Sequence, residues 1–96
     1  MGYTIPVIKT FRHKGLKQLF ETGKSKLVPS EMAKRLVVRL DVLNRAVELR
    51  DLAMFGIHEL GGDRKGTWAI KVTGNYRVTF TFANRDAFDV DLEDYH

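Results

Sequence analysis

Apolar residues in the first half of the chain recur at helical spacing. After residue 29 they are separated by four, four, three and four positions, which places one apolar stripe along a helix: Met32, Leu36, Leu40, Leu43 and Val47. Pro29 suits the first position of this helix, because a missing N–H has no helical partner to lose there. A shorter helix is predicted over residues 13–21, with Gly23 as its stop signal.

The second half of the chain changes to an alternating pattern. Residues 67–73, 75–82 and 87–93 alternate apolar and polar positions, and short turns separate them at residues 74–75 and 84–86. A period of two predicts three successive strands of an antiparallel meander. One face of this sheet should pack on the helices, and the other should face water or a ligand. The predicted inward residues include Trp68, Val78, Phe80, Phe88, Val90 and Leu92.

Two further segments complete the predicted architecture. Residues 7–11 are rich in β-branched and aromatic side chains, which predicts a short strand. Residues 53–66 are glycine-rich and predict a long loop with a short strand at residues 55–60. With 96 residues the chain is expected to form one domain, 1–96, with residues 1–6 as a flexible lead-in. The predicted fold class is α+β: two N-terminal helices packed on a mostly antiparallel sheet of four to five strands.

Composition and charge narrow the function classes. The chain is 44% hydrophobic and 29% charged, as in soluble globular proteins, and shows no membrane-length apolar run or signal-peptide pattern. The absence of cysteine excludes disulfides and thiol chemistry and fits a reducing cytoplasm. Residues 1–52 carry eleven Lys and Arg against five Asp and Glu, a net +6, whereas residues 53–96 carry five against seven, a net −2. The basic half favours a polyanion such as RNA or DNA, although solvated helix faces explain it equally well.

Two cations fall on the polar face of the predicted sheet. Lys71 and Arg77 lie on neighbouring strands around the turn at residues 74–75, so they should share one surface. Like charges held close together favour a bound anion, most commonly a phosphate. The competing interpretation is a cross-strand ion pair with one of the acidic residues on the next strand: Asp89, Asp91 or Glu93.

Acid and base groups gather at the chain end and in the glycine-rich segment. Asp94, Tyr95 and His96 can transfer or orient protons, although a polar tail has the same composition. His58 precedes the Gly61–Gly62 pair, where a glycine-rich backbone can hold phosphate, but a hydrogen-bonded structural histidine fits equally well. The histidines at positions 13, 58 and 96 lack metal-ligand spacing, so no metal site and no cofactor are predicted.

Taken together, these residues resemble the HigB toxins of the RelE-like superfamily. The resemblance runs from about residue 7 to residue 96 and rests on residues 8–16, Leu19-Phe20, His58-Glu59-Leu60, Gly62-Asp63-Arg64, Gly66, Trp68, residues 75–80, residues 86–88 and Glu93-Asp94-Tyr95-His96. It implies a bacterial type II toxin that cleaves mRNA on the translating ribosome. It also implies a HigA antitoxin with a helix-turn-helix fold as partner, so that operator DNA is contacted only through the antitoxin, and no membrane is involved.

The resemblance also assigns roles to individual residues. It implies that Arg77 holds the scissile phosphate, that the chain end is the catalytic group, and that the site is lined by further residues. By position, Asp94, Tyr95 and His96 match the terminal catalytic group, and His58 and Asn75 match positions that line the site. Together with the cations placed by the strand pattern and the glycine-rich segment, this predicts Arg77, Asp94, Tyr95, His96 and His58 as catalytic residues and Asn75, Lys71, Arg64 and Lys65 as RNA-binding residues. The family commonly has a lysine where this chain has Gly61, and Lys65 could take over its charge.

The implied mechanism needs no metal. His96 or Asp94 transfers protons, Tyr95 orients the substrate or assists the leaving group, and Arg77 stabilises the anionic transition state. Two alternatives remain open at this point. One is a basic protein that blocks translation by occupying RNA or the ribosome without cutting. The other is a toxin whose catalysis has decayed, which the glycine at position 61 favours.

Overall fold

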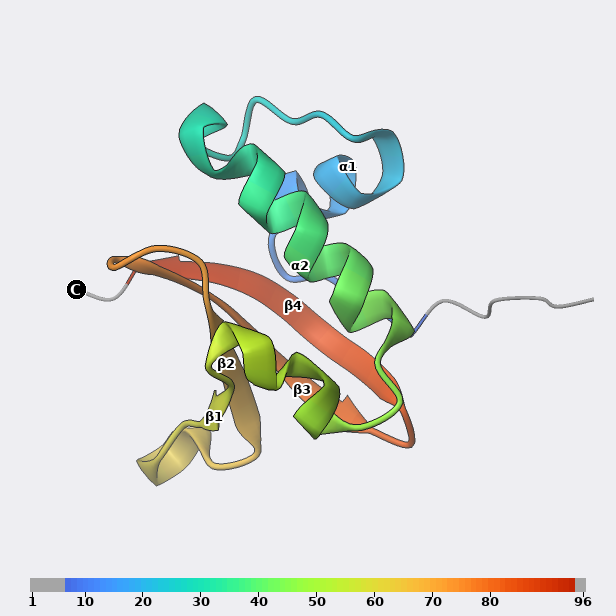
Figure 1. Ribbon diagram of the computed structural model, residues 1–96, viewed down its shortest axis with the longest axis vertical. Coiled ribbons are helices and arrows are strands. Elements are labelled where there is room, and N and C mark those ends of the chain that lie inside the picture. Colours follow the sequence, from blue (N-terminus) through green and yellow to red (C-terminus); the bar gives the residue numbers. More distant parts are fainter. Residues whose placement is uncertain (1–6, 95–96) are drawn as a thin grey trace, which may run out of the picture.

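The computed structural model describes residues 7–94 and confirms the α+β fold class (Figure 1). Within that range, four strands form one antiparallel sheet in the order β1-β2-β3-β4. No helix in the described residues is long and apolar enough to cross a membrane. The lead-in predicted at residues 1–6 lies outside the described range. The elements are α1 (Lys14–Thr22), η1 (Ser30–Met32), α2 (Ala33–Arg45), η2 (Leu49–Phe55), β1 (His58–Glu59), η3 (Gly62–Arg64), β2 (Thr67–Lys71), β3 (Tyr76–Ala83) and β4 (Asp86–Asp94).

The first helix begins and ends on specific caps. The Leu16 N–H donates to Nδ1 of His13 at 3.1 Å, which satisfies one of the free amides of the first turn. At the other end Gly23 takes the left-handed conformation, with φ 81°, and its N–H donates to the Leu19 carbonyl at 2.8 Å. The predicted stop at Gly23 is therefore confirmed, and the helix lies within one residue of its predicted bounds.

The apolar stripe of the second helix is confirmed along most of its length. Met32, Leu36, Leu40 and Leu43 are all buried. Pro29 immediately precedes the 3-10 turn η1, so the prediction that it is the first helical residue was one position early. The prediction for Val47 was wrong, because it is 51% exposed and lies beyond the helix end. The Asp51 carboxylate accepts its N–H at 2.9 Å and starts the next helical turn instead.

Two segments differ from their predicted secondary structure: one contains more helix than predicted, and the other contains less strand. The predicted loop at residues 53–66 contains the end of η2, the short strand β1 and η3, and the strand predicted at 55–60 shrinks to His58–Glu59. Buried Leu52 anchors η2 to the core, which a periodicity search over so short a segment misses. The strand predicted at 7–11 reduces to two isolated parallel bridges, Ile8 to Ala87 and Phe11 to Val90.

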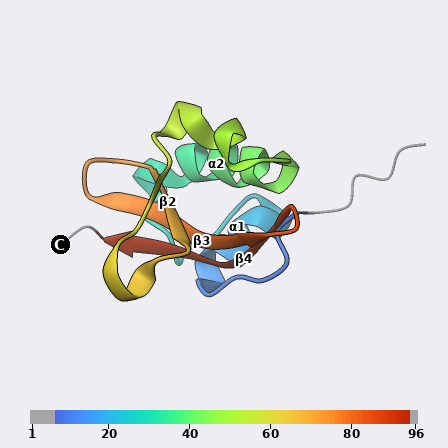
Figure 2. The same ribbon diagram turned by 90° about the horizontal axis from the view of Figure 1, so that it is seen from below.

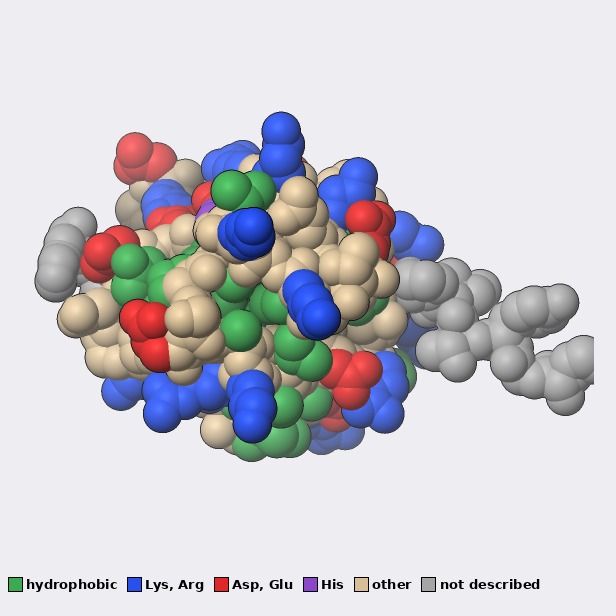
Figure 3. All heavy atoms as spheres, turned by 90° about the horizontal axis from the view of Figure 1, so that it is seen from above, with side chains coloured by type: hydrophobic (Ala, Val, Ile, Leu, Met, Phe, Trp, Pro, Cys, Tyr) green, Lys and Arg blue, Asp and Glu red, His purple; other side chains and the backbone are tan. Residues whose placement is uncertain are grey.

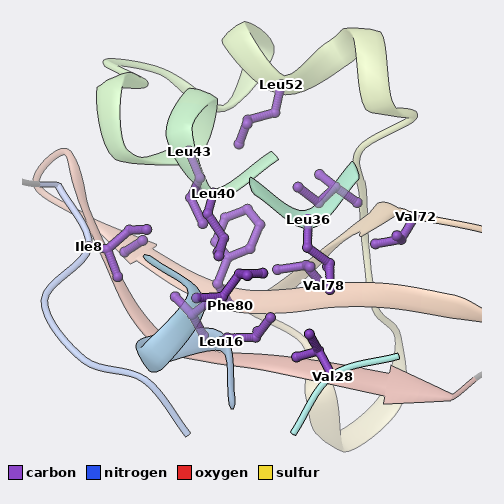
Figure 4. Close-up of a cluster of buried hydrophobic side chains, with 14 of the residues drawn as sticks. Ile8, Leu16, Val28, Leu36, Leu40, Leu43, Leu52, Val72, Val78 and Phe80 are labelled. Carbon is purple, nitrogen blue, oxygen red and sulfur yellow. The ribbon is translucent and has the colours of Figure 1, made fainter. Parts of the chain in front are cut away.

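One face of the sheet is buried beneath α2 (Figure 2). Val78 and Phe80 of β3 point into this layer, and Figure 4 shows Phe80 among side chains from α1 and α2. Val90 is fully buried, and the half-buried Trp68 packs against the same core, which agrees with the predicted inward positions. The opposite face of β2, β3 and β4 is therefore able to carry polar groups.

A β-bulge in β4 overturns the prediction for Phe88. Thr79 pairs with Asp91 and Thr81 with Phe88, so β4 has one residue more than β3 between these pairs. Asp89 takes a φ of 54° at this point, and its N–H donates to Thr10 Oγ1 at 2.7 Å. The bulge reverses the alternation, so Ala87 faces the core and Phe88 shares the outer face with Thr81.

Phe80 and Phe88 give a matched test of this facing. We expect Phe80→Ala to lower the free energy of unfolding by about 3–5 kcal/mol, because it empties the centre of the core. Phe88→Ala removes the same atoms from the half-buried outer face and should cost clearly less. Urea denaturation followed by circular dichroism measures both. Equal losses for the two variants would show that the strand faces are misassigned.

Candidate functional site

Cross-strand pairing sets three charged residues in one row on the outer face of the sheet. Lys71 of β2 lies directly opposite Arg77 of β3, and Arg77 lies opposite Glu93 of β4. Partners in an antiparallel pair have Cβ atoms about 4.5–5.5 Å apart. The prediction that Lys71 and Arg77 share one polar surface is therefore confirmed, and it places two cations side by side.

A pocket of about 300 Å³ opens beside this row. Its lining brings His58 of β1 together with Lys71 and Arg77, and the remaining walls are the backbone of Gly56 and Gly74. Because glycine has no side chain, neither residue obstructs the pocket. The space around Gly74 is open, since a Cβ built there would have no neighbour within 4 Å. A pocket with two cations and an imidazole suits a phosphate that changes its charge during a reaction. Asn75, next to Gly74, is exposed in the adjoining turn.

Glu93 ties the outer face to the glycine-rich segment. The two terminal nitrogens of Arg64 donate to its two carboxylate oxygens at 2.7 and 2.5 Å, and Thr79 Oγ1 donates to Oε2 at 2.6 Å. The pKa of Glu93 is lowered from 4.5 to about 2, chiefly by the hydrogen bonds from Arg64 and also by the hydrogen bond from Thr79 and the charge of Arg77. η3 is thereby fixed over β4, next to the pocket.

This clamp was not predicted. Arg64 was assigned to RNA from the family resemblance, whereas its two terminal nitrogens are bound to Glu93. Glu93 was expected only as one of three possible ion-pair partners of Arg77. Its position opposite Arg77 follows from the strand register, but its pairing with Arg64, 29 positions away, has no signature in the sequence. Thr79, buried on this face, was not assigned a role.

The segment around Gly61 is ordered but open. The Glu59 carboxylate accepts the Gly66 N–H at 2.8 Å and holds the two ends of the segment together. Gly61 has φ −96° and ψ −177°, an extended conformation that any residue adopts, and a Cβ there would meet nothing within 4 Å. Lys65 follows η3 and is exposed. Neither Gly61 nor Lys65 lines the pocket with Arg77, so the replacement of a lysine charge by Lys65 stays a prediction.

The strand that carries the predicted catalytic group ends beside the pocket. Asp94 is exposed at the end of β4 and lies opposite Tyr76, the residue before Arg77. Tyr95 and His96 lie outside the described residues. Among residues 7–94, no group of three or more histidine and acidic residues could hold a metal ion.

Comparison with known proteins identifies the class. Residues 9–96 match the family described as RelE-like toxin of type II toxin-antitoxin system HigB, and the chain belongs to this family. It is also 45% identical to the Endoribonuclease HigB of Proteus vulgaris over 92 residues, which cover 94% of this chain and 100% of that protein. The predicted family is confirmed: the chain is the toxin of a type II toxin–antitoxin system, and both matches support endoribonuclease activity.

The low pKa of Glu93 makes stability depend on pH. A carboxylate whose pKa falls from 4.5 to about 2 on folding stabilises the native state above pH 4.5 and loses that effect as the pH falls toward 2. We expect Glu93→Gln to have a lower Tm than the unchanged protein at neutral pH, and the gap to close between pH 4.5 and 2. Thermal melts across this range measure it, with Glu31→Gln, an exposed residue on η1, as the control. A gap that stays constant with pH would contradict the clamp.

Proposed function

We propose that this toxin cleaves mRNA on the translating ribosome in the cytoplasm, and that a HigA-type antitoxin with a helix-turn-helix fold neutralises it. The main support for this proposal is the pocket, whose lining includes His58, Lys71 and Arg77 beside the end of β4. Family membership and the name of the Proteus vulgaris relative support the reaction class. Operator DNA would be bound only through the antitoxin.

The cations of the pocket would bind the scissile phosphate and stabilise its negative charge during cleavage. A base removes the proton of the ribose 2′-hydroxyl, this oxygen attacks the adjacent phosphorus, and an acid protonates the departing 5′-oxygen. Negative charge builds on the non-bridging oxygens during the attack. Arg77 and Lys71, side by side in the pocket, offer fixed donors where this charge develops.

The groups that would transfer protons come from the last residues of the sequence and from the lining of the pocket. His96 and Asp94 are the candidates for base and acid, and Tyr95 orients the substrate or assists the leaving group. His58 lines the pocket with Arg77 and is a further group that can carry a proton near neutral pH. Asn75, at the rim, and Lys65, after η3, supply RNA contacts.

Two features favour RNA presented by the ribosome. The helical half carries a net +6 from residues 1–52, and Figure 3 shows Lys and Arg side chains spread over the face where the helices lie. Such a surface attracts ribosomal RNA. The pocket is also open and holds few groups, so a second body that fixes the 2′-hydroxyl in line with the leaving oxygen would contribute much of the rate.

The experiment adds the protein to a reconstituted translation mixture and maps the 5′ ends of the mRNA. We expect defined cuts from the unchanged protein, and a loss of about 10²-fold or more in rate for Arg77→Ala and for His96→Ala. Lys24→Ala, which removes an exposed cation from the loop between α1 and η1, is the control and should lose far less of the cleavage rate than either variant.

The outcomes separate the alternatives. Arrest of translation without cuts would indicate a protein that acts by occupancy, and no effect at all would indicate decayed catalysis. Equal cleavage rates on naked mRNA and on mRNA that is being translated would show that cleavage does not depend on the ribosome. Full activity in a well-folded Arg77→Ala protein would remove the phosphate-holding role of that arginine.

Gly61 allows a gain-of-function test. If a lysine there neutralises charge in the transition state, Gly61→Lys should raise the cleavage rate roughly 5- to 150-fold, by analogy with hydrogen bonds to charged groups worth about 1–3 kcal/mol. The backbone accepts a side chain at this position without strain, because its φ is negative and the space around it is open. Gly61→Gln is the uncharged control. A rate for Gly61→Lys that equals that of Gly61→Gln would show that the added charge does not reach the reacting phosphate.

A further inference from the structure

A second hollow continues the pocket around the end of β2. It has a volume of about 420 Å³ and lies between α2, η2 and the β2–β3 turn. Its lining includes Arg35 and Arg39 of α2 and Phe55 of η2. It shares Gly56, Lys71 and Gly74 with the pocket that holds Arg77, so the two hollows form one groove. The groove leads from the outer face of the sheet to the helical side.

Arg39 is held in place within this groove. Its Nε donates to the Lys71 carbonyl at 2.7 Å, and its Nη1 donates to the Arg35 carbonyl at 3.1 Å. The centre of its guanidinium lies 4.6 Å from the centroid of the Phe55 ring, a cation–π contact. An arginine fixed on three sides loses little conformational entropy when it binds a ligand.

Three cations of the groove, Arg35, Arg39 and Lys71, form no ion pair with a carboxylate of the described residues. Within residues 7–94, the ion pairs involve Lys9, Arg45, Arg50 and Arg64 instead. Burial, and then the charge of Arg35, lower the pKa of Arg39. Positive groups packed together without counter-charges repel one another, and a bound polyanion would relieve that repulsion.

We propose that this groove binds the RNA phosphodiester backbone next to the scissile phosphate, with Arg35 and Arg39 on the phosphates of neighbouring nucleotides. The proposal rests on the proposed function, because it takes the Arg77 pocket as the site of cleavage. A groove that combines a row of cations with an aromatic ring matches the way proteins hold single-stranded nucleic acid. Met54, 72% exposed at the rim beside Phe55, offers an apolar surface to a base.

Binding, not cleavage, provides the test. The full chain with His96→Ala, which should not cut, is titrated into a short fluorescent single-stranded RNA at several salt concentrations. A parallel arm measures co-sedimentation with purified ribosomes. Arg35→Gln and Arg39→Gln are each added to this background. Lys34→Gln is the matched control, because Lys34 is an exposed cation of the same helix that does not line the groove.

We expect each groove variant to bind the RNA roughly 5-fold or more weakly at about 0.1 M salt, the effect of removing one charged hydrogen bond. The slope of log affinity against log salt should become shallower by about 0.7 for each phosphate that the variant no longer neutralises. Lys34→Gln should change both quantities much less. If Arg39→Gln lowers the melting temperature, Arg35→Gln carries the test, since its side chain is exposed.

Each outcome has one meaning. Weaker RNA binding by the groove variants alone supports binding of mRNA. Unchanged RNA binding with weaker ribosome co-sedimentation would overturn binding next to the scissile phosphate and would assign the groove to ribosomal RNA instead. If Lys34→Gln weakens binding as much as the groove variants do, the RNA is attracted by the overall positive charge and not by the groove, which would overturn the proposal. Unchanged binding in both arms would overturn it as well. Because no cleavage is measured, failure of the proposed function leaves these results interpretable.

Discussion

Burial of one sheet face beneath α2 is the constraint on which the rest of the structure depends. Side chains alternate along a strand, so placing Val78 and Phe80 in the core forces Arg77 and Thr79 to the opposite face. A shift of one residue would bury Arg77 and expose Phe80, which is far too costly to occur. The face that carries the candidate site is therefore as firmly positioned as the core itself.

Glu93 places one negative charge on that face, next to the two positive charges of Lys71 and Arg77. It lies opposite Arg77, yet its carboxylate oxygens accept hydrogen bonds from Arg64 and Thr79. Its negative charge thus orders the η3 segment, while Lys71 and Arg77 remain together on the pocket wall. One carboxylate joins the glycine-rich segment to the rigid sheet, and so links the two parts of the chain that border the pocket.

Regular patterns made much of this fold and site predictable. The stripe from Met32 to Leu43 and the alternation of β2 and β3 are dictated by burial over many residues, so the sequence shows them clearly. The errors arise where one hydrogen bond outweighs a pattern. Val47 lies beyond the end of α2, where its N–H donates to Asp51, and the bulge at Asp89 reverses the facing of Phe88. The Arg64–Glu93 clamp depends on three-dimensional proximity alone, which a single sequence does not encode in any local form.

The segment at residues 7–12 lies along β4 and joins residues that are far apart in the sequence. Thr10 bonds to Asp89 across 79 positions, and the bridges of Ile8 and Phe11 join the same two regions. Pairings between such distant segments raise the contact order and delay folding. The native sheet cannot close until the chain has been synthesised past Val90. Under the proposed mechanism, a nascent toxin therefore lacks a working site until β4 has left the ribosome and paired with the segment at residues 7–12.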